Sequence, residues 1–204
     1  MKSTILALTA AALFALASAA SAGPIVGDKE WRQLTETTGF SWLIVNTSCG
    51  TGICSGDIGG VSVDGWHWAD NADLQELFEQ LIQPASTQFP TATTNYFNAN
   101  DADIAGVLDN VFTPTAELFG FREAKGFSRS TVDDFNAYLA YFSDSPFANQ
   151  DDMAVLDSPV PTNFGHESIG IWLYRPAADV PEPASLALLG VGIAGLRLMK
   201  RRRC

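Results

Sequence analysis

The stretch Ser168-Ile169-Gly170-Ile171-Trp172-Leu173-Tyr174 decides the fold expected for this chain. It contains no charged residue and is rich in β-branched and aromatic side chains. Such a composition is typical of a strand buried in a sheet. We therefore expect a central strand here, able to pair with a strand from the N-terminal part of the chain.

Two earlier segments also have the character of strands. Residues 40–45 read FSWLIV, and residues 61–63 read VSV. Aromatic and β-branched residues favour a strand in the first segment, and alternation of apolar and polar residues favours one in the second. Asp64 and Gly65 follow as a hairpin-type turn signal.

Between these strands, three segments space their apolar residues three or four positions apart, as in a helix with one buried face. The three stripes are Leu74, Leu77, Phe78, Leu81 and Ile82; Ile104, Val107, Leu108 and Val111; and Val132, Phe135, Leu139 and Phe142. The expected N-caps are Asp70 or Asn71, Asn100 or Asp101, and Ser130, in that order. The sequence thus predicts an α+β fold with central helices and terminal strands.

The N-terminus has the layout of a secretory signal peptide over residues 1–22. Lys2 supplies a positive charge, an apolar run covers residues 5–17, and Ala20-Ser21-Ala22 fits the small-x-small rule of signal peptidase. We expect cleavage before Gly23. The alternative is a permanent N-terminal anchor, for which the apolar run is short.

The C-terminus, residues 180–204, has three consecutive parts. Val180-Pro181-Glu182-Pro183 comes first, residues 184–199 are apolar apart from Ser185 and Arg197, and the basic residues Lys200, Arg201, Arg202 and Arg203 follow. Sixteen helical residues reach about 24 Å, which makes a short transmembrane helix. The basic cluster holds the end of the chain in the cytoplasm, so the preceding domain lies outside.

This three-part tail resembles the PEP-CTERM sorting signal of exopolysaccharide-producing Gram-negative bacteria. The resemblance implies that an exosortase processes the chain at the Pro-Glu-Pro box, after a transient stay in the inner membrane. It also implies a final location at the cell surface or in the extracellular matrix, with exopolysaccharide as a possible partner. The alternative is an ordinary single-span anchor. In either case the tail says nothing about the activity of the exported domain, residues 23–179.

The charge of the exported part is strongly negative. All 23 acidic residues of the chain lie between Asp28 and Glu182, where only six basic residues occur, so this stretch has a formal charge of −17. Such a surface repels nucleic acid and anionic lipid, and it attracts divalent cations. We therefore expect no nucleic-acid partner.

Cys49 and Cys54 flank a glycine-rich loop and are expected to form a disulfide in an oxidising compartment. The alternative, a metal or redox pair, lacks the Cys-x-x-Cys spacing and a second pair of ligands.

Two candidate binding features stand out in the domain. Trp66 and Trp68, in the segment Gly65-Trp66-His67-Trp68-Ala69, offer flat faces for contact with a glycan, or else they anchor a strand-to-helix corner in the core. This corner and the closing strand resemble elements of bacterial C-type-lectin-like surface domains. Asn100, Asp101 and Asp103 form a possible calcium site, or else an acidic helix N-terminus.

No catalytic arrangement emerges from the sequence. His166-Glu167 lacks the second histidine of a zinc protease, and the chain contains no Gly-x-Ser-x-Gly elbow. We therefore expect a non-enzymatic surface or matrix protein without a cofactor. The alternatives are a calcium-assisted carbohydrate-binding module and a secreted hydrolase.

The signal-peptide pattern makes a direct prediction. The exported protein should begin at Gly23, because Ala20 and Ala22 place small residues at the two positions that signal peptidase reads. N-terminal sequencing of the exported protein checks this. Recovery of Met1 would show that the segment is retained as an anchor.

Overall fold

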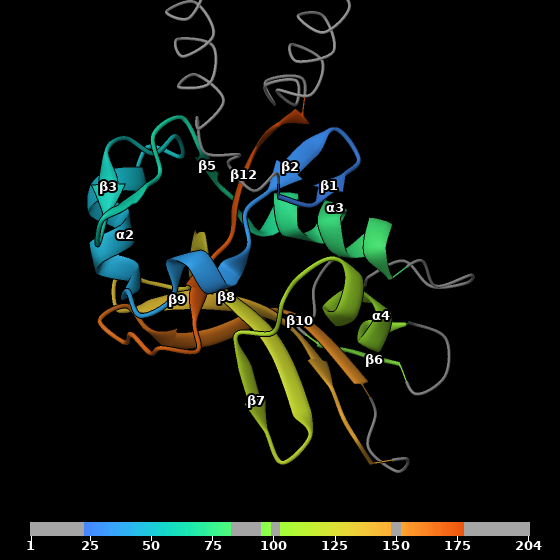
Figure 1. Cartoon of the computed structure of the whole chain (residues 1–204). Coiled ribbons are helices and arrows are strands. Elements are labelled where there is room, and N and C mark those ends of the chain that lie inside the picture. The colour runs from blue at the N-terminus through green and yellow to red at the C-terminus, as the bar shows by residue number, and fades with distance from the viewer. Residues whose placement is uncertain (1–22, 83–94, 99–102, 148–151, 178–204) are drawn as a thin grey trace, which may run out of the picture. The chain divides into compact units, whose positions relative to one another are not determined.

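The computed structural model describes residues 23–82, 95–98, 103–147 and 152–177 (Figure 1). Gly23–Ala178 group into one compact unit. The expected signal peptide, the Pro-Glu-Pro box and the apolar tail lie outside the described residues. Within the described part of the chain, no helix combines the length and the apolar character needed to cross a membrane.

The first sheet joins the two ends of the domain. Its four antiparallel strands are ordered β1 (Ile25–Val26), β2 (Lys29–Trp31), β12 (Leu173–Pro176) and β5 (His67–Trp68). Trp31 of β2 lies opposite Tyr174 of β12. The predicted pairing between N-terminal and C-terminal strands is therefore confirmed.

The second sheet has six strands and lies below the first in Figure 1. Its order is β11 (Gly170–Ile171), β8 (Phe121–Thr131), β9 (Asn136–Asp144), β10 (Asp152–Pro161) and β6 (Asn95–Asn98), and β7 (Ala116–Leu118) also pairs with β8. All its pairs are antiparallel except β11 with β8. A separate small hairpin pairs β3 (Asp57–Ile58) with β4 (Val61–Ser62).

The predicted strand over residues 168–174 is divided between the two sheets. It runs parallel to β8 as β11, breaks at Trp172, and continues as β12 in the other sheet. Backbone hydrogen bonds hold the break, since Trp172 N donates to Phe127 O at 3.2 Å and Ala69 N donates to Trp172 O at 2.9 Å. This segment therefore connects the sheets, and β12 is central in its own sheet, as expected.

Alternate side chains of this segment enter two different hydrophobic cores. Ile169, Ile171 and Leu173 belong to one core, together with Trp68 and Phe127. Trp172 belongs to the other, together with the buried faces of α3 (Asn71–Leu81) and α4 (Ile104–Asn110). Successive side chains of an extended chain point to opposite sides, so a single strand supplies both cores.

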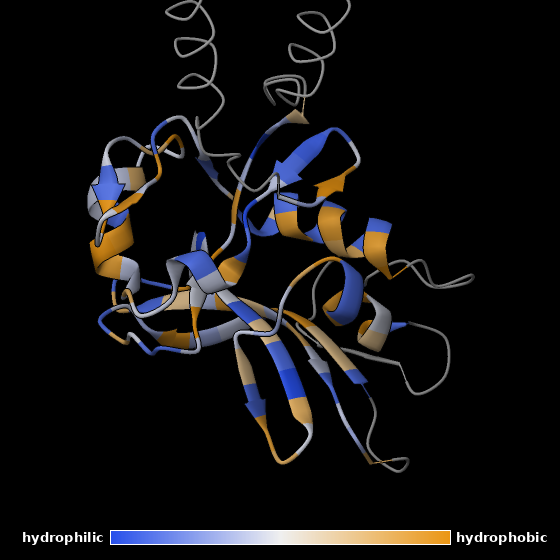
Figure 2. Cartoon of the chain, in the orientation of Figure 1, coloured by the Kyte–Doolittle hydropathy of each residue, from blue (hydrophilic) through white to orange (hydrophobic). Residues whose placement is uncertain are grey.

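The two helices that contribute to the Trp172 core agree with the sequence patterns. Asp70, one of the two expected N-caps, caps α3, and it forms a capping box with Asp73. In Figure 2, α3 carries both hydrophobic and hydrophilic residues, as expected of an amphipathic helix. Asp103 caps α4 in place of the expected Asn100 or Asp101, which lie outside the described residues.

The predicted strand over residues 40–45 is wrong. Ser41 accepts a hydrogen bond from Ile44 N, at 3.4 Å, and caps the helix α2 (Trp42–Cys49). Leu43 and Ile44 are exposed while Val45 is fully buried. The prediction of a strand from composition failed here because Ser41 provides a local helix cap. A short 3-10 helix, η2 (Leu34–Thr37), precedes α2 in the chain.

The predicted helix over residues 132–142 is also wrong, so two of the three expected central helices, α3 and α4, are present in an α+β fold. The residues form the β8–β9 hairpin, whose turn is held by Asp133. Its Oδ1 accepts hydrogen bonds from Phe135 N, at 2.7 Å, and Asn136 N, at 2.8 Å. Val132 and Phe135 are exposed, so the supposed helical stripe was not one buried face.

The turn at Asp64 and Gly65 is present, but it does not close a hairpin. Trp66 N donates to Val63 O at 3.1 Å, and Gly65 has a φ of 75°. The strands on either side, β4 and β5, belong to different sheets. The turn therefore directs the chain from the small hairpin to the first sheet.

Gly126 of β8 packs closely against Trp172 and Leu34. A Cβ placed there would lie 2.7 Å from Leu34 Cδ2 and 3.0 Å from Trp172 Nε1. Both neighbours are fully buried, and the Trp172 Nε1 donates to Ala140 O at 2.9 Å.

We predict that Gly126→Ala destabilises the domain by about 1–3 kcal/mol, because the added methyl overpacks the Trp172 core. Thr131→Ala, at an exposed position of the same strand, should change the free energy of unfolding by less than about 0.5 kcal/mol. Chemical denaturation of both variants measures the difference. Equal stability of the two would show that the core accommodates the methyl group.

Candidate functional site

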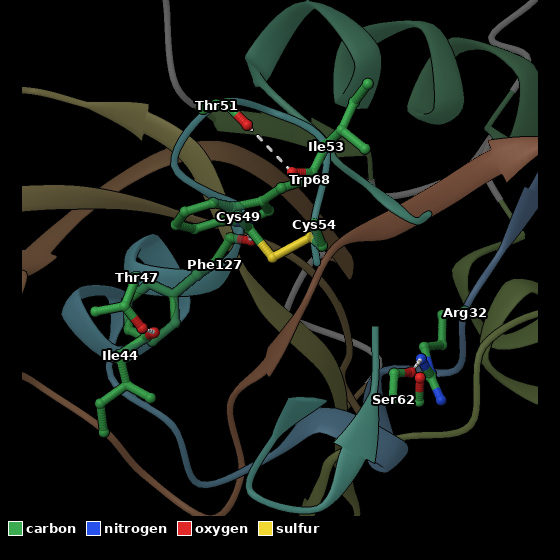
Figure 3. Close-up of a disulfide and its surroundings, with 10 residues drawn as sticks. All are labelled: Arg32, Ile44, Thr47, Cys49, Thr51, Ile53, Cys54, Ser62, Trp68 and Phe127. Carbon is green, nitrogen blue, oxygen red and sulfur yellow. Dashed lines mark hydrogen bonds between the residues drawn. A yellow bond between two sulfur atoms is a disulfide. The ribbon is translucent and has the colours of Figure 1, made fainter. Parts of the chain in front are cut away.

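The glycine-rich loop after α2 is closed by a disulfide between Cys49 and Cys54, as expected (Figure 3). Both cysteines are buried, and Trp68 and Phe127 lie beside them. Trp68 Nε1 donates to Phe127 O at 3.1 Å. Because both sulfurs are in the disulfide, neither is a thiolate ligand for a metal.

The two tryptophans of the candidate glycan corner have different environments. Trp68 is 1% exposed and belongs to the core, which is the anchoring role that the sequence left open. Trp66 is half-buried, and the guanidinium carbons of Arg32 and Arg175 lie 5.2 and 4.7 Å from its ring centroid. These cation–π contacts occupy ring surface that a sugar would otherwise use.

The basic residues of the domain are all committed to ion pairs with its own carboxylates. The pairs are Lys29 with Asp73 and Glu76, Arg32 with Glu36, Arg122 with Asp109 and Asp144, Lys125 with Glu123, Arg129 with Asp70, and Arg175 with Glu30. These are the six basic residues between Asp28 and Glu182. The remaining carboxylates carry the negative charge of the domain.

A polar cluster that the sequence did not reveal fastens the start of α3 to the six-stranded sheet. The register of β8 shifts between Phe127 and Thr131, and that of β10 shifts between Val155 and Ser158. Such bulges re-aim side chains. Their polar residues meet at Asn71, which interacts with Ser128, Ser130 and Asp157.

In this Asn71 cluster, Asn71 accepts one hydrogen bond and donates two. Ser128 Oγ donates to Asn71 Oδ1 at 2.8 Å, Asn71 N donates to Ser130 Oγ at 3.0 Å, and Asn71 Nδ2 donates to Asp157 Oδ1. Burial raises the pKa of Asp157, and the hydrogen bond from Asn71 partly offsets this effect. Register shifts depend on long-range strand pairing, so no sequence signal indicated this cluster.

Part of the predicted calcium site lies within the described residues. Asp103 Oδ1 accepts a hydrogen bond from Gly106 N at 2.7 Å, as the N-cap of α4. Asn100 and Asp101 lie outside the described residues. Among the residues that the structure does describe, no group of three or more His, Cys, Asp or Glu side chains is placed to hold a metal ion.

Both histidines have neighbours within the domain. The His67 ring stacks on Tyr174 with a centroid distance of 5.1 Å, next to Lys29, whose Nζ is 4.8 Å from the same tyrosine ring. Burial is the main cause that raises the pKa of Tyr174 to about 12. His166 is exposed, and its Nδ1 lies 2.8 Å from Ser168 Oγ.

The strongest functional signal in the chain follows the last described strand. Residues 179–203, about an eighth of the chain, match the PEP-CTERM protein-sorting motif. The chain carries a PEP-CTERM sorting motif. The match contains the predicted processing residues Val180, Pro181, Glu182 and Pro183 and the basic residues Lys200, Arg201, Arg202 and Arg203.

The PEP-CTERM motif indicates an exported protein of a Gram-negative-type envelope that is processed by an exosortase. Searches with the chain found no match among curated proteins and none among solved structures. The resemblance to C-type-lectin-like domains gains no support from these comparisons and stays a prediction.

Two half-buried carboxyls, Asp152 and Asp157, predict a specific response of the domain to mild acid. Burial raises the pKa values of Asp157 and Asp152 above the usual 3.8. The folded domain therefore binds these protons at a higher pH than the unfolded chain does. The contribution of these two carboxyls to the free energy of unfolding should rise as the pH falls from 7 through their raised pKa values, and this gain should be complete below about 3.8.

Asp157→Asn tests this pH dependence. The variant should melt at a higher temperature than wild type at pH 7, and it should gain less on acidification, because the neutral amide keeps an acceptor for Asn71 without a buried charge. Asp134→Asn removes an exposed carboxylate and controls for the general relief of negative charge. Identical melting profiles for the two variants would contradict the prediction.

Proposed function

We propose that this protein is a non-enzymatic component of the cell surface or of the exopolysaccharide matrix, released there after an exosortase removes its tail. The observation that carries the proposal is the PEP-CTERM motif at residues 179–203. An exported domain with this motif passes through the inner membrane only transiently. Its final partner is then an extracellular structure, and we propose exopolysaccharide.

The charge of the domain supports a location in a hydrated matrix. Between Asp28 and Glu182 the formal charge is −17, and all six basic residues of that stretch are in internal ion pairs. A surface of this kind keeps a protein soluble and free of nucleic acid and anionic lipid. Divalent cations would bridge its carboxylates to anionic sugars, which is a mode of association that needs no dedicated calcium site.

The roles of the chemically versatile side chains support a non-enzymatic domain. Cys49 and Cys54 close a loop, Asp103 caps a helix, and the Asn71 cluster fastens α3 to the sheet. Trp66, the remaining candidate for glycan contact, already lies under two guanidinium groups. Each of these groups has a structural task, so the proposal assigns none of them to catalysis.

We predict that the exported wild-type protein lacks residues 186–204 and fractionates with extracellular polysaccharide. Glu182→Ala should keep Cys204 and accumulate in the inner membrane, because it alters the Pro-Glu-Pro box that the exosortase reads. Glu167→Ala, at an exposed position of the domain, is the matched control and should behave as wild type. Intact mass and cell fractionation measure both effects.

Three outcomes would overturn parts of this proposal. Wild-type protein that keeps Arg203 and Cys204 at its final location would show that the tail is only an anchor. Shortening of the polysaccharide during incubation with the purified protein would identify a hydrolase. Release from defined neutral glycans by a chelator, with retention in matched sodium, would identify a calcium-assisted carbohydrate-binding module.

A further inference from the structure

A buried carboxylate of β2 holds the first residue of the domain. Glu30 is 1% exposed, although a charged side chain is rarely buried unless its charge is paired. Its Oε2 accepts a hydrogen bond from Nε of Arg175 on β12, which forms an ion pair. Its Oε1 accepts one from the backbone nitrogen of Gly23, at 3.0 Å.

Only glycine fits at position 23 without moving the chain. A Cβ on this residue would lie 1.8 Å from the carbonyl oxygen of Trp31, so any side chain would displace the chain from β2. The next residue continues the contact, because Trp31 N donates to Pro24 O at 2.8 Å. The absence of a side chain on Gly23 therefore allows the chain to lie close to β2, and the hydrogen bond to Glu30 fixes its backbone nitrogen.

This nitrogen is the atom that the predicted signal cleavage alters. Hydrolysis of the Ala22–Gly23 bond consumes one water, leaves a carboxylate on Ala22, and converts the Gly23 amide nitrogen to an amine, which is protonated at neutral pH. A neutral N–H donor becomes an ammonium group next to the same carboxylate. Hydrogen bonds between an ammonium and a carboxylate are shorter and stronger than those of a neutral amide.

We propose that Glu30 is the binding site for the mature N-terminus, and that signal-peptide cleavage strengthens the first sheet by placing an ammonium group on Glu30 Oε1. The carboxylate then has a cationic partner on each oxygen, the Gly23 ammonium and the Arg175 guanidinium. The new charge also lies in a strongly negative domain, which favours an added cation.

A stronger contact between Gly23 and β2 also affects β12, the last strand of the domain. β1 and β12 flank β2, and the N-terminal and C-terminal strands lie side by side in Figure 1. β12 is the last strand before the sorting motif at residues 179–203. Cleavage at Gly23 therefore strengthens the sheet that contains β12, so N-terminal maturation stabilises the strand that leads into the sorting motif. This inference does not depend on where the protein finally resides.

The test moves the ammonium group by one residue in the exported full chain. One serine is inserted between Ala22 and Gly23, so that cleavage after Ala22 leaves Gly23 with an amide nitrogen. N-terminal sequencing verifies both start sites. The melting temperature should fall by about 2–6 °C relative to wild type. An unchanged melting temperature, or a wild-type start other than Gly23, would overturn the proposal.

Comparing Glu30→Gln with and without the serine insertion shows whether Glu30 causes the fall in melting temperature. In a Glu30→Gln background the same insertion should change the melting temperature by less than about 1 °C, because the charged partner is absent. A fall as large as in wild type would mean that the insertion acts sterically, and Glu30 would not be the site.

A chemical measurement covers the case in which Glu30→Gln does not fold. The α-amine of native wild-type protein should react with an acylating reagent at least about tenfold more slowly than that of the insertion variant, because the Glu30 contact protects it. Mass spectrometry of the N-terminal peptide separates this amine from the lysines. Equal rates would overturn the proposal.

Discussion

The architecture depends on the break at Trp172, where one strand leaves the six-stranded sheet and enters the four-stranded sheet. Successive side chains there point to opposite sides, so Ile171 and Leu173 fill one core while Trp172 fills the other. The indole also donates to Ala140 O and packs on Gly126, which fixes its position relative to β8 and β9. The two cores are therefore joined through one short segment of the chain.

Ion pairs within the domain form a second set of connections between its segments. Of the six basic residues between Asp28 and Glu182, four pair with carboxylates that are distant in sequence: Lys29, Arg122, Arg129 and Arg175. The other two, Arg32 and Lys125, pair with the nearby Glu36 and Glu123. Lys29 joins β2 to α3, and Arg175 joins β12 to β2. The carboxylates that remain unpaired keep the exported domain soluble and disfavour its binding to anionic membranes or nucleic acid.

The sequence predicted features whose information is local. Asp70 and the stripe after it indicated α3, because capping and the helical period involve residues within a few positions of one another. The two cysteines five positions apart indicated their disulfide. Of the candidate site residues, Trp68 proved to be a core anchor and Asp103 a helix cap, which were the structural alternatives to ligand binding.

By itself the sequence determined that this protein carries a PEP-CTERM sorting motif, because the Pro-Glu-Pro box, the apolar segment and the basic end follow one another in a continuous stretch of the chain. Only the tertiary structure decided that residues 132–142 belong to a β-hairpin instead of a helix, that bulges gather Ser128, Ser130 and Asp157 around Asn71, and that Glu30 accepts a hydrogen bond from Gly23. A strand is stabilised by a partner far along the chain, and a buried charge by whichever group the fold brings to it. Such contacts leave no periodic pattern in the sequence.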